Sequence, residues 1–394
     1  MASYGATPAA KTTPAPSSRA AELRVLGVVF GVKGLSESLP TLASYYVLER
    51  EFGVRVQGGQ GVVALLMVPF VAKPLFGLIS DRFPLYGRRR RPYILLAAVV
   101  NALGWALCAA AAAHKWERGC VGGLMLANLG IALGVTVAEA VAVQMSSGMS
   151  DSAARSLQST MWLANFGGSG LGAAVALLLV TPTNSGSVFA WLALLPLLPL
   201  PLYAGMRDDR YVAGERRGSF AEDVASSARH LTESPMLRSM CVLGLVAAAV
   251  PSAGQGSGGD SLTYYLDEKL HYSRRTLAEM QLANIVGMAL GVLLAKSYSG
   301  ALKPVLYAAV GCTSACMLLT AAAIEVQAGF LPLAVASGAA FELFAVPVSF
   351  PCAAGYPVAL CPAPCPPMAR RWRCAPRWHG AGAVPPAKPI LAHC

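Results

Sequence analysis

Charged side chains are scarce in this chain: only 13% of its 394 residues are Asp, Glu, Lys or Arg, whereas 55% are hydrophobic. A soluble domain has roughly 25% charged residues, so a soluble fold of this composition would have too few polar side chains to cover its surface. Apolar runs of about 20 residues, the length that crosses a bilayer as a helix, recur along the chain. Because the backbone in lipid must satisfy its own hydrogen bonds, the composition predicts an all-α polytopic membrane protein.

The sequence also lacks the patterns of several other function classes. It has no G-x-x-x-x-G-K-[ST] loop, which disfavours an ATP-driven pump, and no H-E-x-x-H or nucleophile–base pattern near the apolar runs, so we do not expect an enzyme. Its ten cysteines fit neither a disulfide framework nor a zinc pattern, and we expect no cofactor or metal. The net charge of +11 gathers in short connections rather than on an aromatic-rich basic face, so we expect no nucleic-acid partner.

The apolar runs predict about ten membrane-spanning helices. The expected spans cover, each within about a turn, residues 25–47, 61–79, 93–113, 121–144, 157–180, 188–206, 241–253, 277–295, 305–324 and 331–350. Basic residues concentrate in the connections that follow even-numbered spans, including Arg82, Arg88 to Arg91, Arg155, Lys296 and Lys303. The positive-inside rule therefore predicts a cytosolic N-terminus. A plasma membrane and a plastid envelope both fit.

Polar segments divide the chain into five expected parts. We expect a disordered cytosolic tail at 1–23, a six-helix bundle at 24–206 and a basic cytosolic linker at 207–238. An incomplete C-terminal helical bundle is expected at 239–358, followed by a Pro-, Arg- and Cys-rich tail at 359–394. Six spans, a long basic connection and further spans together resemble the layout of the major facilitator superfamily.

The connection after the second expected span carries the most specific motif. Gly77 stands four residues before Asp81, and Gly87 precedes a run of arginines, which resembles the superfamily signature between helices two and three. A longer pattern resembles the folate–biopterin transporter family more closely. It comprises Pro69, Lys73, Pro74, Leu75, Gly77, Ser80, Asp81, Phe83, Pro84, Gly87, Arg89, Arg91, Pro92 and Tyr93. Phe70 stands where that family has tryptophan.

Two later segments bear on the same resemblance. Leu157, Gln158 and Ser159, with Trp162 a turn later, resemble the family's L-Q-S segment at the start of span five. The family has twelve spans, and its late L-C-P element begins here at Leu360 before the match stops. We hypothesise a changed reading frame or splice boundary near that residue.

The motif implies a conformational latch made of Gly77, Asp81, Arg82, Gly87 and Arg89. A glycine allows a neighbouring helix to pack closely. The aspartate can pair with a basic group on the other half of the protein, and the arginines can hold the loop against the anionic inner leaflet. Pairing of that kind would stabilise one conformation of the transport cycle.

Two charged residues inside spans are candidates for substrate binding, because a charge there costs about 2.5–3.5 kcal/mol on insertion scales. Lys73 lies about 12 Å from Asp81 along the helix axis, and we expect it to face a cavity as counter-ion to a substrate carboxylate such as the glutamate tail of folate. The alternative is a lysine that snorkels to the inner surface. Glu139 can bind the amino-pyrimidinone edge of a pterin or carry a coupled proton, and the alternative is a protonated helix-packing residue.

Other polar residues in the spans carry weaker signals. Gln158 and Asn165 can donate to a heterocycle or can link helices. Tyr264 can stack on a flat ring or belong to an interfacial aromatic belt. Lys33 and Glu37, four residues apart, are expected to form a structural pair on one helix face.

The leading functional hypothesis is a secondary-active transporter of folates or reduced pterins that works by alternating access. Its expected partners are the bilayer, an anionic small molecule and coupled protons, and we expect a monomer. One alternative keeps the fold and carries another organic anion or an amino-acid-like solute. The other is a truncated membrane protein that does not transport.

Overall fold

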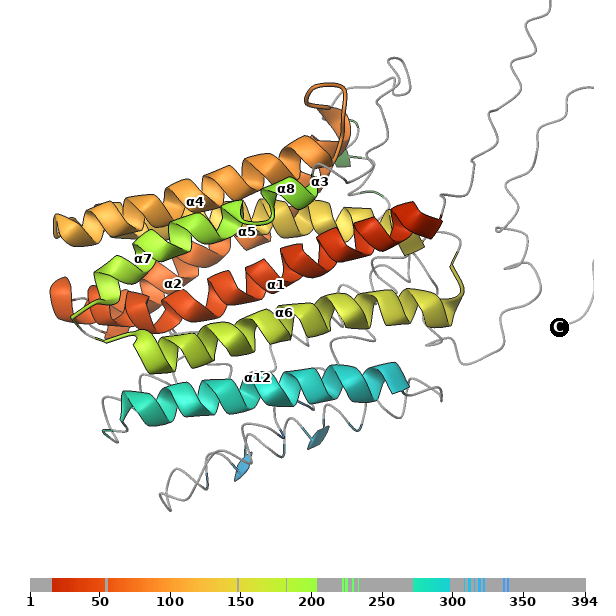
Figure 1. The fold of residues 1–394 in the computed structure, drawn as a ribbon. Helices are drawn as coiled ribbons and strands as arrows, with labels where there is room; N and C mark the ends of the chain where they lie inside the picture. The colour runs from red at the N-terminus through yellow and green to blue at the C-terminus, as the bar shows by residue number, and fades with distance from the viewer. Residues whose placement is uncertain are drawn as a thin grey trace, which may run out of the picture. The chain divides into compact units, whose positions relative to one another are not determined.

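The computed structural model describes residues 16–53, 56–146, 149–181, 183–203, 271 and 273–297, with isolated residues within 222–233 and 308–339. The chain divides into two units, Met1–Tyr356 and Pro357–Cys394, and all described residues belong to the first. The described elements are all helices (Figure 1). The predicted all-α class is therefore confirmed. The spans predicted at 241–253, 305–324 and 331–350 lie outside the described residues, apart from isolated positions.

The helices follow one another with short connections. They are α1 (Pro16–Tyr46) with a π-helical turn η1 (Val47–Glu51), α2 (Val56–Val71), α3 (Lys73–Arg82), α4 (Arg91–Ala113), α5 (Glu117–Ser146), α6 (Asp151–Leu179), α7 (Ser185–Leu194), a 3₁₀ turn η2 (Leu195–Leu197), α8 (Leu200–Tyr203) and α12 (Arg274–Ser297). Six stretches of the described chain are long and apolar enough to cross a membrane: Glu22–Tyr46, Arg91–Ala113, Glu117–Ser146, Ser152–Leu179, Ser185–Leu202 and Ala278–Ser297. These correspond to the first, third, fourth, fifth, sixth and eighth predicted spans.

The second predicted span differs from the structure, because it is two helices rather than one. Helix α2 ends at Val71 and α3 begins at Lys73, with Ala72 between them. Pro74 has no backbone N–H to bond to the preceding turn, so the helical hydrogen-bond ladder is interrupted there. The break places Lys73 at the first position of α3.

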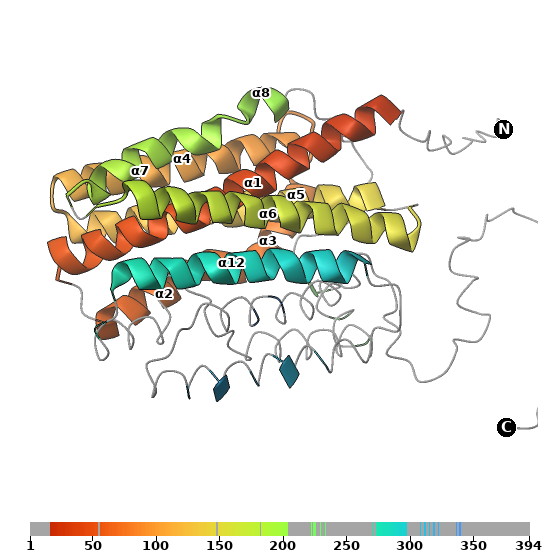
Figure 2. The same ribbon diagram turned by 60° about the horizontal axis from the view of Figure 1, so that its bottom comes forward.

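Two pairs of helices form the centre of the described bundle. Helix α1 packs along α6, and α4 packs along α5 (Figure 1, Figure 2). A buried cluster that includes Leu26, Phe30, Ile94, Val137 and Met161 joins the two pairs at one end. A second cluster, built around stacked Trp105 and Phe189, joins α1, α4, α5 and α7 further along.

Helix α12 packs on the outer side of α6 (Figure 2). Its Ile285 and Val292 are buried with Phe166 and Ala173 of α6. Residues from a late part of the chain therefore pack against α6, the helix that carries Gln158 and Asn165.

Candidate functional site

The first charged pair joins α3 to α5. Lys73 Nζ lies 3.4 Å from Glu139 Oε1, and 29% of the lysine side chain and 43% of the glutamate side chain remain exposed. The ammonium also lies 5.9 Å from the centre of the Phe70 ring, so an aromatic face is kept where the family pattern has tryptophan. Both predicted binding residues thus lie together, in a loose and partly open ion pair at the break between α2 and α3.

The second charged group, here called the Lys33 cluster, comprises Lys33 and Glu37 of α1 with Trp162 and Asn165 of α6. Lys33 Nζ donates to Glu37 Oε2 at 2.7 Å and to Asn165 Oδ1 at 2.9 Å. The same ammonium lies 5.8 Å from the centre of the Trp162 ring. The predicted pairing of Lys33 with Glu37 is confirmed, whereas its link to Asn165 was not foreseen.

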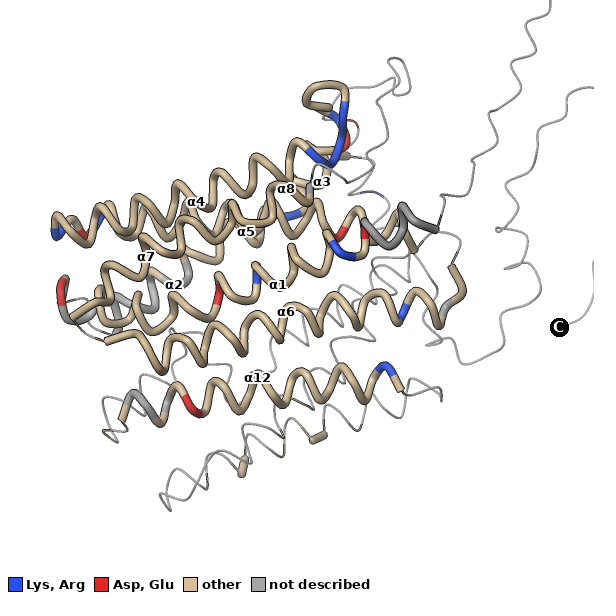
Figure 3. Tube along the Cα trace, in the orientation of Figure 1, with Lys and Arg blue, Asp and Glu red and all other residues tan. Residues whose placement is uncertain are grey.

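Charged residues inside the described helices are few, as Figure 3 shows, so these two groups are prominent. The Lys33 side chain is only 12% exposed, while that of Glu37 is 32% exposed. Val135, one turn before Glu139 on α5, lines the same small cavity as Lys33. The cavity beside Lys33 thus reaches a residue one helical turn from Glu139 on α5.

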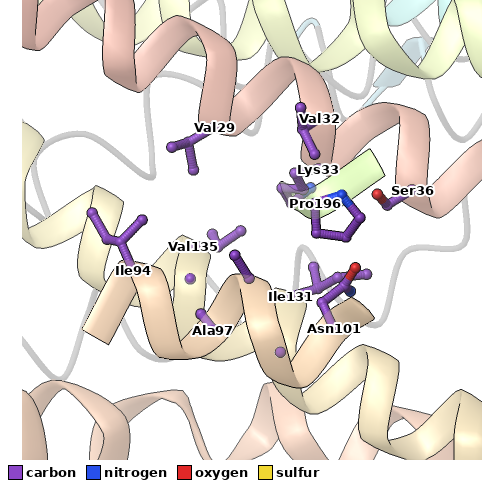
Figure 4. A pocket seen from close by; sticks show the side chains of 13 residues that line it. Val29, Val32, Lys33, Ser36, Ile94, Ala97, Asn101, Ile131, Val135 and Pro196 are labelled. Carbon is purple, nitrogen blue, oxygen red and sulfur yellow. The ribbon is translucent and has the colours of Figure 1, made fainter. Parts of the chain in front are cut away.

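That cavity has a volume of about 50 Å³ and is lined by residues of α1, α4, α5 and η2 (Figure 4). A single water needs at least about 10–15 Å³ by this measure, so the space suits a few water molecules and not a substrate the size of a pterin. Ser36 Oγ and Asn101 Oδ1 line it and have no hydrogen-bond partner in the described part of the chain. Water in the cavity would satisfy both atoms.

The remaining predicted binding residues are placed less centrally. The Oε1 atom of Gln158 is buried on α6 without a hydrogen-bond partner among the described residues. Gln158 lies one turn before Trp162, on the face of the helix that carries Asn165. Tyr264 lies outside the described residues.

The predicted latch aspartate lies in the last turn of α3, and its partner is the residue directly before α4. Asp81 Oδ1 lies 2.5 Å from Arg90 Nη2, and Arg90 Nη1 donates to Ser80 Oγ at 3.0 Å. Arg90 is only 7% exposed. Sequence reasoning missed this arginine because it is one of four in a row, and only the fold determines which of them turns inward.

The two glycines of the predicted latch have different surroundings. Gly87 has φ +69°, a left-handed conformation that favours glycine. A Cβ added at Gly77 would lie 3.8 Å from Thr136 Cγ2, an ordinary van der Waals distance, so close packing of α3 on α5 does not require glycine there. Arg82 and Arg89, the other two predicted latch residues, each take part in an interaction.

Replacing Arg90 with alanine should destabilise the protein more than replacing Arg88 with alanine. The first change leaves Asp81 and Ser80 without their buried donor, which costs about 2–3 kcal/mol, whereas no ion pair of Arg88 occurs among the described residues. Thermal unfolding in detergent can be followed with a maleimide dye that reacts as buried Cys108 and Cys120 become exposed. Equal melting temperatures for the two variants would contradict the assigned role of Arg90.

Comparison with known proteins decides the family. The sequence profile of the BT1 family matches residues 33–344. This chain belongs to the BT1 family. The folate-biopterin transporter of Synechocystis sp. is 33% identical to this chain over 178 residues. The aligned segment covers 45% of this chain and 35% of that protein. The chain is 28% identical over 187 residues to the probable folate-biopterin transporter 7 of Arabidopsis thaliana, covering 47% of this chain and 42% of that one.

A third relative is the folate transporter 2 of Plasmodium falciparum, which is 30% identical over 124 residues, 31% of this chain and 27% of that protein. The aligned part thus spans less than half the length of each of these relatives. The predicted resemblance to folate–biopterin transporters is confirmed at the level of the family.

Solved structures confirm the fold. The major facilitator superfamily transporter FucP, in its outward conformation, superposes with a TM-score of 0.60 at 13% identity and covers 86% of each chain. The human organic anion transporter MFSD10 superposes with a TM-score of 0.56 at 17% identity, covering 88% of this chain and 93% of that one. This BT1 family member is therefore an integral, multi-pass membrane protein with a major-facilitator fold.

Proposed function

We propose that this BT1 family chain acts as a secondary-active transporter of folates or reduced pterins by alternating access. The names of its relatives and its major-facilitator fold support the substrate class and the mechanism. We further propose a monomer with a cytosolic N-terminus that carries its substrate together with protons and performs no chemical reaction.

The observation that carries the proposal is the open ion pair between Lys73 and Glu139. Lys73 lies nine residues from Arg82, the last residue of α3, which is about 13 Å along the axis. Charges at such depth avoid lipid and face a cavity or a partner, because exposure to hydrocarbon is costly. Partial exposure of both side chains at this depth supports a water-accessible path beside them.

The proposed binding step follows from the geometry of this pair. The distance from Lys73 Nζ to Glu139 is 3.4 Å, which is long compared with the 2.7 Å between Lys33 and Glu37. The Lys73 ammonium can therefore donate a hydrogen bond to a second carboxylate. A substrate carboxylate that binds Lys73 would displace Glu139. The freed glutamate would then take up a proton, which couples substrate binding to proton binding.

The remaining predicted site residues take supporting roles in this proposal. Gln158, Asn165 and Tyr264 would contact the heterocycle of the substrate. Gly77, Asp81, Arg82, Gly87 and Arg89 would set the conformation of the cytosolic loop, with Arg90 added as the residue that holds Asp81.

The direct test is uptake of radiolabelled folate by cells that express the chain at their surface, with unlabelled competitors. Uptake above that of empty-vector cells, inhibited by folate and biopterin, would support the proposal. Uptake at background for a surface-localised protein would contradict it. Stronger inhibition by unrelated organic anions or amino acids would show that the same fold carries a different substrate.

Replacing Glu139 with glutamine should uncouple uptake from the proton gradient, because a glutamine side chain cannot take up a proton when the substrate displaces it from Lys73. In proteoliposomes, an inward acid gradient should stimulate the wild type several-fold and leave the Glu139→Gln variant unchanged. Glu117→Gln serves as the control, because Glu117 is exposed at the start of α5. Equal stimulation of the Glu139 variant and the wild type would exclude Glu139 as the coupling group.

A further inference from the structure

Glu37 is an ion-paired carboxylate with one side left open. Lys33 binds its Oε2 atom at 2.7 Å, and the described residues provide no side-chain partner for Oε1. An ionised carboxylate has about four acceptor positions on its two oxygens. Most of the hydrogen-bonding capacity of Glu37 is therefore available to a further group.

The depth of Glu37 in the bundle limits what that group can be. Glu37 lies 15 residues after Glu22 and nine before Tyr46, the ends of the first membrane-spanning stretch, which is about 22 Å and 13 Å along the axis. A carboxylate that is 32% exposed at this depth meets water or a ligand, because contact with lipid would be costly. A purely structural pair would gain nothing from being open there.

The face of α6 that contacts Lys33 provides further polar and aromatic groups. Gln158, Trp162 and Asn165 are spaced i, i+4 and i+7, so they share one helix face. Gln158 Oε1 is buried without a partner among the described residues. Trp162 contacts the rings of Phe166 at 5.7 Å and Phe30 at 6.4 Å, and Leu282 of α12 belongs to the same cluster. Such apolar surroundings strengthen a hydrogen bond made beside them.

These groups match the chemistry of a pterin ring. The 2-amino group and the N3–H of a pterin are two parallel donors, which a carboxylate accepts with both oxygens, as it accepts the two parallel N–H groups of arginine. The ring is flat and uncharged, so it requires acceptors and apolar walls rather than a counter-ion. The Lys33 ammonium already neutralises Glu37, which lowers the cost of keeping that carboxylate ionised when water is displaced.

We propose that Glu37, held in place by Lys33, binds the amino-pyrimidinone edge of the substrate ring, while Lys73 binds the carboxylate tail. This inference rests on the proposed function and divides its site into two parts. The Lys33 cluster selects for the ring, and the Lys73–Glu139 pair selects for the anionic tail.

The test is displacement of radiolabelled folate from the purified full chain by two competitors that each carry half of the substrate. Biopterin has the ring without the glutamate tail, and p-aminobenzoylglutamate has the tail without the ring. Glu37→Gln should weaken biopterin competition about 10- to 100-fold, the value of a charge-assisted hydrogen bond, and leave p-aminobenzoylglutamate competition unchanged. Glu117→Gln, an exposed carboxylate on α5, should change neither.

Each outcome separates this inference from the proposed function. Unchanged biopterin competition in Glu37→Gln, or an equal loss for both competitors, would overturn the assignment of the ring to Glu37. If the wild type itself binds no folate, the proposed function fails and this inference fails with it. Should Glu37→Gln be poorly folded by size-exclusion chromatography, Trp162→Phe and Glu37→Asp provide the same comparison. These variants should also weaken biopterin alone, and an unchanged biopterin affinity in both would overturn the inference.

Discussion

Folate uptake should fall to background when Lys73 is replaced by alanine. The change removes the proposed counter-ion of the substrate tail and leaves Glu139 without the lysine that lies 3.4 Å from it. A charge-assisted hydrogen bond is worth about 1.5–3 kcal/mol, so the apparent affinity should fall at least tenfold before any cost from the unpaired glutamate is added. Lys73→Arg keeps the charge and should retain part of the uptake.

Lys296→Ala is the matched control for Lys73, because Lys296 is an exposed lysine in the last turn of α12. Uptake should be normalised to the amount of protein at the cell surface, measured by biotinylation. Wild-type uptake by the Lys73→Ala variant would show that the lysine does not bind substrate, and the binding mechanism proposed here would be wrong.

The stability of the bundle should fall sharply when Gly168 is replaced by alanine. A Cβ at this position of α6 would lie 2.0 Å from the carbonyl oxygen of Gly31 on α1, a distance that requires the two backbones to separate. Forcing extra atoms into a packed interior costs about 1–3 kcal/mol, and occasionally more. Since the bond from Lys33 to Asn165 crosses the same interface, ligand binding should weaken together with stability.

Gly167→Ala provides the control in the adjacent position, because a Cβ there meets no atom within 4 Å. Alanine also favours the helix by about 1 kcal/mol over glycine. Thermal unfolding in detergent should therefore give a lower melting temperature for Gly168→Ala and an equal or higher one for Gly167→Ala. Similar behaviour of the two variants would contradict the close contact between α1 and α6.

The helices of the first half could be predicted from the sequence because each apolar run is long and is bounded by polar or charged residues. The expected span at 93–113 is α4, Arg91–Ala113, and the one at 121–144 is α5, Glu117–Ser146. The break at Ala72 was missed because the apolar run continues beyond it, with Lys73 the only charged residue before Asp81. Pro74 was the available signal, but proline is common in membrane helices and does not always end one.

The site could be predicted only in part, because its contacts join residues far apart in the chain. Lys33 and Glu37 are one helical turn apart, so their pairing followed from spacing alone. Asn165 is 132 residues from Lys33, and its bond to that lysine depends on the packing of α1 against α6. Likewise, charge inside apolar spans identified Lys73 and Glu139 as candidates, but only the fold brings them within reach of each other.

The central claim is that the Lys73 side chain lies on a water-accessible path and binds an anionic substrate there. Replacing Lys73 with cysteine and treating the variant with charged methanethiosulfonates tests both halves of this claim. The aminoethyl reagent restores a positive charge at this position and should recover folate uptake, whereas the sulfonatoethyl reagent adds a negative charge and should keep uptake at background. Untreated and treated wild-type protein should behave alike. Failure of both reagents to react, or equal uptake after either one, would contradict the account.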